Sequence, residues 1–208
     1  MKPLARRAAL LGALSAALLT SACAPLLVGG AMVGTALMTT DRRTSGTQIE
    51  DQGIELKAST RLREQIGDRA HISVNSYNRM VLLTGEAPSE GDRAAAERVV
   101  AQIDNVSRVL NEIVVSGNSS LTSRSNDVLI ASKVKASLVD ARDLISNAFY
   151  VVVERGTVFI MGRVTEREAT RASEIARGVG GVQKVVRAME IISEEELARI
   201  TPQAPAGK

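Results

Sequence analysis

The spacing of apolar residues changes several times after residue 49, from a helical period to short continuous runs and back. Apolar residues recur at every fourth position from Ile54 to Ile66, which is typical of one face of an amphipathic helix, and Gly67 follows where that helix could end. Two runs of strand length come next, separated by the two-residue turn Asn78-Arg79. The pattern predicts helix, strand, strand, helix and strand, in this order: 54–66, 72–77, 80–86, 93–103 and 108–115.

A second copy of this pattern follows at an offset of 76 or 77 residues. Residues 81–85 (VLLTG) align with 158–162 (VFIMG), so that the apolar triplets and the glycines coincide. Ser125, Asn126 and Asp127 offer N-caps for the first helix of this copy. The remaining elements are predicted in the same order as in the first copy: a helix to about 141, strands 149–154 and 157–163, a helix from 165 and a strand 182–192.

The first 23 residues have the layout of a bacterial lipoprotein leader. Basic residues come first (Lys2, Arg6 and Arg7), an apolar run covers 8–19, and small residues lead up to Cys23, the one cysteine of the chain. A lone cysteine cannot form an intramolecular disulfide, and its place at the cleavage position predicts that it carries a covalent lipid. The alternatives are a free or buried cysteine after an ordinary signal peptide, and an uncleaved membrane anchor, because no charged residue lies between 8 and 40.

The repeat and the leader together predict six segments. They are a signal peptide (1–22), a lipidated apolar tether and linker (23–48), a first module (49–116), a linker (117–124), a second module (125–193) and a disordered tail (194–208).

Composition argues against several classes of function. The chain has 26 basic and 23 acidic residues, and removing the three basic residues of the leader leaves 23 of each, so the mature chain is formally neutral. With no Trp, two Tyr and two Phe, it lacks the cationic surface and the stacking platforms of a nucleic-acid binder. His71 is the one histidine and is expected to be a solvent-exposed residue at a strand end. We therefore expect no enzymatic activity, no metal and no cofactor.

Three stretches resemble a known family: Asp41–Gln48 after the tether, Ser125–Asp127 at the start of the second module, and Val158–Ala169. They are similar to the dual BON-domain outer-membrane lipoproteins of the DolP type, and the resemblance covers about residues 19 to 193. It implies an α+β fold of two tandem BON modules, each αββαβ, with a three-stranded mixed sheet covered by two helices.

The resemblance also implies a place on the periplasmic face of the outer membrane, with Ala24 after the cysteine favouring that membrane over the inner one. Association with anionic phospholipid and a role in membrane integrity, including at division sites, are further implications, with the lipid contact on the first helix of the second module. Charge supports that choice, because bases outnumber acids by two over 124–142 and acids outnumber bases by one over 50–69. Val128, Leu129, Lys133 and Lys135 are the predicted phospholipid contacts, whereas Ile130, Val134 and Leu138 are expected to pack inward.

Gly85 and Gly162 follow an apolar strand at matched repeat positions, where a glycine marks either close backbone packing or the approach of a ligand. We expect packing. An alternative to lipid binding is a protein-interaction scaffold, in which sheet edges pair with envelope proteins or cell-wall enzymes.

Overall fold

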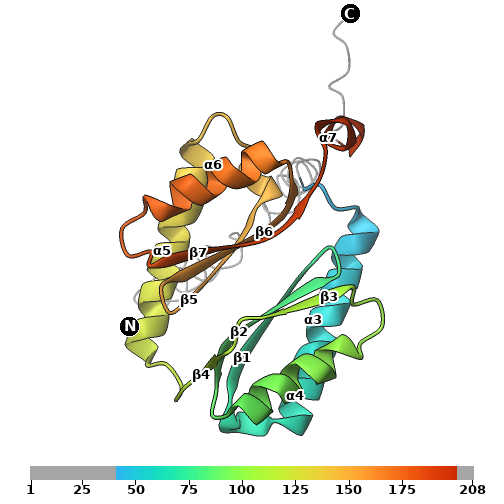
Figure 1. The fold of residues 1–208 in the computed structure, drawn as a ribbon, viewed down its shortest axis with the longest axis vertical. Helices are drawn as coiled ribbons and strands as arrows, with labels where there is room; N and C mark the ends of the chain where they lie inside the picture. The colour runs from blue at the N-terminus through green and yellow to red at the C-terminus, as the bar shows by residue number, and fades with distance from the viewer. Residues whose placement is uncertain (1–40, 201–208) are drawn as a thin grey trace, which may run out of the picture. The chain divides into compact units, whose positions relative to one another are not determined.

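The computed structural model describes residues 41–200, and the chain divides into two units, Met1–Thr39 and Thr40–Lys208. Cys23, the leader and the tether lie outside the described residues. Every element named below belongs to the second unit (Figure 1). No helix between residues 41 and 200 is both long enough and apolar enough to cross a membrane.

The first module follows the predicted order of elements. They are α3 (Ser45–Gln65), the short 3-10 helix η2 (Gly67–Arg69), β1 (His71–Tyr77), β2 (Met80–Ala87), α4 (Glu90–Ala101), β3 (Arg108–Asn111) and β4 (Val114–Val115). Asn78 and Arg79 both have positive φ, as a two-residue hairpin of this kind requires. Gly67, with φ of 67°, follows the last residue of the helical stretch.

The last strand of the first module is interrupted, which the sequence did not predict. Residues 108–115 were expected to form one strand, but β3 ends at Asn111 and β4 resumes at Val114. The Asn111 side chain accepts a hydrogen bond from the backbone N–H of Ile113. This local bond competes with the backbone hydrogen bonds that would pair this residue with β2. The buried Ile113 side chain instead joins the module's core.

The second module repeats this order. Its elements are α5 (Leu121–Asp140), the 3-10 helix η3 (Ser146–Ala148), β5 (Tyr150–Glu154), β6 (Thr157–Val164), α6 (Glu166–Arg177) and β7 (Lys184–Ile191). The predicted N-caps at 125–127 are wrong, because α5 begins earlier and is capped by Ser120, whose hydroxyl accepts from the Ser123 N–H. The predicted start of α6 is confirmed, since Thr165 and Glu168 form a reciprocal capping box.

The segment after the second module is partly helical. The sequence predicted disorder from residue 194, but Glu194–Ile200 forms the short helix α7. Its N-terminal half carries three glutamates, which a helix N-terminus favours. Residues 201–208 lie outside the described part of the chain.

Each module has a mixed sheet with its second strand, β2 or β6, in the centre. In the first, β2 pairs antiparallel with β1 and parallel with β3; in the second, β6 pairs antiparallel with β5 and parallel with β7. The parallel pairing needs a crossover connection, which α4 and α6 provide. One face of each sheet packs against the two helices of its own module in a separate apolar core.

The other faces of the two sheets pack against each other. Their shared core contains, from both modules, Tyr77, Met80, Leu82, Phe159, Met161 and Ala188. Alternate side chains of a strand point to opposite faces, so Leu82 enters this core while Val81 and Leu83 enter the core beneath the helices. Burial on both faces explains why the central strands are continuous apolar runs rather than alternating ones.

Candidate functional site

The helix α5 is held in place by a buried row of apolar residues and one buried acid. Ile130, Val134 and Leu138 are buried in the core of the second module, in agreement with the sequence expectation. Asp127 lies on the same side of the helix. Its carboxylate accepts hydrogen bonds from the backbone N–H groups of Arg155 and Gly156, at 2.9 and 2.8 Å, and so closes the turn of the β5–β6 hairpin.

The first module uses the same device. Asp51 of α3 accepts from the N–H groups of Asn78 and Arg79 in the β1–β2 turn, both at 2.8 Å, and from the Ser76 hydroxyl. The sequence did not lead us to this role for either acid, although they stand at an offset of 76, each three residues before the first buried isoleucine of its helix. An acid at the same position of both repeats was the sequence signal that could have indicated this shared role.

The predicted phospholipid contacts all lie on the solvent-facing side of α5. Val128 is 66% exposed and Leu129 is 59% exposed, and both lysines, Lys133 and Lys135, are exposed. Within residues 41–200 neither lysine has an ion-pair partner. Leu121 and Val139, which the sequence reading did not single out, are also exposed and extend the apolar surface toward both ends of the helix.

The outward charge of α5 is more positive than a count along its sequence suggests. One of its two acids, Asp127, is buried and turned to the hairpin. An anionic surface approaching this helix would therefore meet Lys133 and Lys135 with only Asp140 opposing them among the exposed charges of the helix.

The structure also changes the comparison with α3. Three of its acids are engaged elsewhere: Asp51 is buried, Glu50 pairs with Arg79 at 2.6 Å, and Glu55 accepts from the Ser76 N–H at 2.7 Å. The exposed charges left on this helix are Lys57, Arg61, Arg63 and Glu64. The formal charges of the two segments therefore exaggerate the difference between the surfaces that the helices present.

A pocket of about 210 Å³ opens beside Val128, one of the exposed apolar residues of α5. Its lining residues come from α5 and from the edge strands of both sheets: His71, Arg124, Asp127, Val128, Ala131, Val153 and Glu154. Burial raises the pKa of Glu154 to about 7, the nearby carboxylates Glu86 and Asp127 add to the rise, and Arg124 and Arg155 oppose it. His71, expected to be exposed, is half-buried at this pocket.

Glu86 is the most buried acid near this pocket. Its side chain is fully buried, and neither carboxylate oxygen has a hydrogen-bond donor in the described residues. The nearest guanidinium belongs to Arg155, 3.5 Å away. A second, larger pocket of about 490 Å³ lies at the turn of the first hairpin, away from the predicted lipid contacts.

The two glycines singled out in the sequence both lie against backbone. Gly85 has φ of 108°, and a Cβ there would overlap the carbonyl oxygen of His71. A Cβ at Gly162 would overlap the carbonyl oxygen of Ala148. This geometry supports a packing role for both glycines.

An ion-pair clamp ties the segment before α3 to the second module. The Arg42 guanidinium donates to both carboxylate oxygens of Glu168, each at 2.7 Å, and to the carbonyl oxygen of Arg163 at 2.9 Å. The next residue, Arg43, pairs with Asp51 of the first module at 2.9 Å and lies over the Tyr77 ring. These adjacent arginines thus connect the segment before α3 to both modules.

No group of three or more His, Cys, Asp or Glu residues within 41–200 is arranged to hold a metal ion. The described surface offers an apolar and cationic helix face, of the kind that adsorbs to an anionic surface.

Comparison with known proteins agrees with this architecture. The BON domain model matches residues 51–117 and 126–193. The chain is 33% identical over 195 residues to "Outer membrane lipoprotein DolP" of Haemophilus influenzae, covering 92% of this chain and 98% of that protein. It is 30% identical to "21 kDa hemolysin" of Actinobacillus pleuropneumoniae, covering 73% of this chain and 79% of that protein.

Among solved structures, the C-terminal domain of CdsD, a structural protein of the type III secretion system of Chlamydia trachomatis, matches with a TM-score of 0.29 and 9% identity. The match covers 64% of this chain and 96% of that domain. The family assignment rests on the two domain matches and on the relatives identical over most of their length. The chain therefore belongs to the BON-domain family, as a dual-BON protein of the DolP type.

Proposed function

We propose that this protein is an outer-membrane lipoprotein, anchored through Cys23, whose second module binds anionic phospholipid through α5 and thereby supports the integrity of that membrane. The relative from Haemophilus influenzae is named an outer membrane lipoprotein, and the leader of this chain ends at a lone cysteine. The proposed role is non-enzymatic.

One observation carries the lipid-binding part of the proposal. Val128 and Leu129 stand exposed beside Lys133 and Lys135, on a helix whose acid Asp127 is buried. Apolar side chains that dip among headgroups, flanked by cations, are typical of a surface that adsorbs to an anionic bilayer. Each suitably placed cation contributes about 1 kcal/mol.

Flotation of residues 41–208 with vesicles tests the proposal. This fragment contains all three apolar cores and corresponds closely to the second compact unit. We expect it to float with vesicles that contain phosphatidylglycerol and to stay behind with phosphatidylcholine alone.

Two kinds of variant separate the charge and apolar contributions. Lys133→Glu with Lys135→Glu should weaken binding most at low salt, by roughly 30-fold if each cation contributes about 1 kcal/mol. Leu129→Asp should weaken it at all salt concentrations, because apolar insertion is not screened.

A matched control comes from the first module. Lys57→Glu with Arg61→Glu should have much less effect, provided that circular dichroism shows intact folding. If the parent fragment fails to bind anionic vesicles, the lipid-binding proposal is wrong and a protein-interaction scaffold becomes the better explanation.

A further inference from the structure

Exposed apolar side chains are concentrated on two of the helices. Among the described residues eleven large apolar side chains are exposed, and six of them belong to α3 or α5: Ile49, Leu56, Leu121, Val128, Leu129 and Val139. In that same part of the chain α4, α6 and α7 contribute none. Contiguous exposed apolar surface on a soluble protein marks an interaction site more often than scattered apolar residues do.

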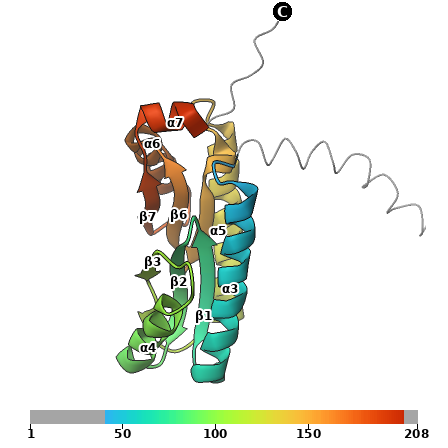
Figure 2. The same cartoon turned by 90° about the vertical axis from the view of Figure 1, so that its right-hand side faces the viewer.

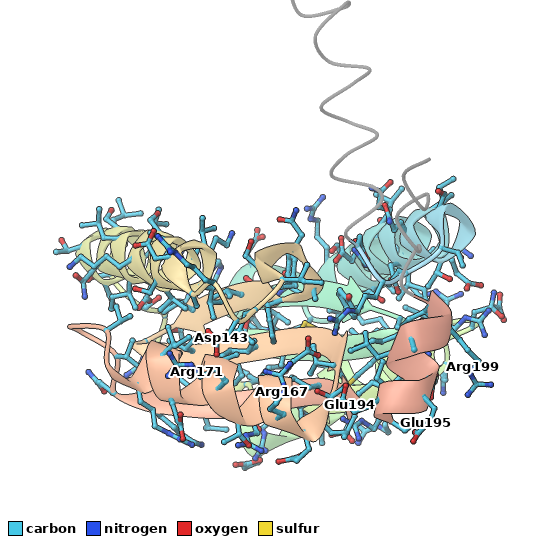
Figure 3. The ribbon with its side chains drawn as sticks, turned by 90° about the horizontal axis from the view of Figure 1, so that it is seen from above. Asp143, Arg167, Arg171, Glu194, Glu195 and Arg199 are labelled. Atoms are coloured by element: carbon cyan, nitrogen blue, oxygen red, sulfur yellow. The ribbon has the colours of Figure 1, made fainter. Side chains whose placement is uncertain are left out.

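The two helices lie on the same side of the sheets. In Figure 2 the helices α3 and α5 run along the right-hand side, while α4, α6 and α7 lie on the left. Figure 3 agrees, with α3 and α5 along the upper side and the labelled Arg167 and Arg171 of α6 and Glu194 of α7 along the lower side. The apolar residues therefore share one side of the molecule, and the opposite side carries mixed charge.

Helical spacing groups these apolar residues into rows. Ile49 and Leu56 are seven residues apart, about two turns, so they stand one above the other on the side of α3 that faces away from its buried row. They are 70% and 71% exposed. On α5 the same seven-residue spacing joins Leu121, Val128 and Lys135.

Contacts between the modules hold the two rows in a fixed relation. The shared core between the sheets and the buried pair of Arg42 with Glu168 both cross the boundary between the modules. On the side of α3 and α5, the Tyr150 hydroxyl of β5 donates to the Asn75 side-chain oxygen of β1 at 3.2 Å. Both helices would therefore meet a flat partner together rather than one at a time.

We propose that α3 is a second contact with the same anionic bilayer, and that the protein docks through both first helices, with Ile49 and Leu56 inserting beside the apolar row of α5. The proposal rests on the lipid binding proposed above and extends it to the first module. Charge complementarity favours a bilayer as the occupant, because the exposed Arg63 continues the row of Ile49 and Leu56 at the same seven-residue spacing. The α3 acids Glu50, Asp51 and Glu55 are engaged within the fold.

Two contacts on one rigid body also raise the affinity well above that of either contact alone. Once α5 touches the bilayer, α3 is held near it at high effective concentration, so a weak second contact can contribute strongly. The contribution of α3 should come mainly from its apolar row. The Arg61 guanidinium is turned toward the end of α4 and donates to the carbonyl oxygen of Gln102. Reversing the charges of Lys57 and Arg61 should therefore matter little.

The test uses residues 41–208, vesicles containing phosphatidylglycerol, and Ile49→Asp with Leu56→Asp. We expect binding to fall roughly tenfold, because two apolar side chains lose insertion. The matched control is Val114→Asp with Ile191→Asp, which changes two exposed apolar residues outside both helices and should leave binding within about twofold.

A second measurement introduces no charged residue into the proposed contact. Residues 41–208 contain no cysteine, so Leu56→Cys, Val128→Cys and Ile191→Cys can each carry one environment-sensitive fluorophore. We expect a blue shift on anionic vesicles at positions 56 and 128, and none at 191. A shift at 128 alone, with unchanged affinity of the α3 double variant, would overturn the two-helix proposal and leave binding through α5 intact. If the parent fragment does not bind anionic vesicles, both the two-helix proposal and binding through α5 are wrong.

Discussion

The pairing of Arg42 with Glu168 makes a strong prediction about stability. Both side chains are only 4% exposed, and the guanidinium meets the carboxylate in a bidentate arrangement with both distances at 2.7 Å. Removing one partner from such a pair leaves a buried charge without compensation, which typically destabilises a protein by about 3–5 kcal/mol. Since the whole free energy of unfolding of a domain is about 5–15 kcal/mol, either single change should remove a large part of it.

The two single variants should differ in a way that the structure dictates. Arg42→Met leaves the Glu168 carboxylate buried, but its hydrogen bond from the Thr165 N–H remains, so we expect a loss of about 3 kcal/mol. Glu168→Ala leaves the guanidinium with the carbonyl oxygen of Arg163 and also dissolves the capping box of α6, so we expect about 4 kcal/mol. Arg42→Met combined with Glu168→Ala should cost less than the sum of the two single losses.

Urea unfolding of residues 41–208, followed by circular dichroism, measures these losses. The pH dependence provides a second check. Burial alone would raise the pKa of Glu168, but the hydrogen bonds from Arg42 and from the Thr165 N–H lower it overall. The stabilisation should therefore be complete above the ordinary glutamate pKa of 4.5 and be lost as pH falls through the lowered value. Additive losses, or a loss below about 1 kcal/mol for Arg42→Met, would refute the reasoning.

Three other predictions follow from the sequence and the site. Cys23→Ser should give a soluble or unprocessed protein in membrane fractionation, and a fully cleaved variant that still fractionates with membranes would argue against lipid anchoring. Gly85→Val and Gly162→Val should each lower the melting temperature, because a Cβ overlaps backbone at both positions; unchanged melting with lost lipid binding would contradict this. Because the pKa of Glu154 is raised to about 7, stability should fall as pH rises from 4.5 to about 7, and Glu154→Gln should abolish that decline in urea unfolding.

Features governed by local chemistry were predictable from the sequence. The Asn78-Arg79 turn, the helix end at Gly67 and the capping box begun by Thr165 depend on neighbours within a few residues. The helical period also separated the buried Ile130 from the exposed Val128 and Leu129 on α5. These residues are placed by the winding of their own helix, so distant parts of the chain do not alter the outcome.

Features governed by distant partners were not predictable in this way. Asp127 resembled an N-cap, but its carboxylate accepts from the N–H groups of a hairpin 28 and 29 residues further on, and Ser120 takes the capping role. The charge contrast between the first helices is smaller on the surface than in the sequence for the same reason. A count along the sequence gives Glu50 and Asp51 the weight of free anions, whereas the fold pairs one with Arg79 and buries the other.

The stacking of the two sheets limits where this protein can meet a partner. The outer face of each sheet is covered by its own helices, and the inner faces cover each other, so among the described elements only sheet edges and the backs of helices face outward. In both modules the large exposed apolar residues of the helices lie on the first helix, α3 or α5, and not on the second, α4 or α6. Folding explains the inward rows of all four helices and gives no reason for this asymmetry. A surface outside the protein, contacted by the first helix of each module, does give one.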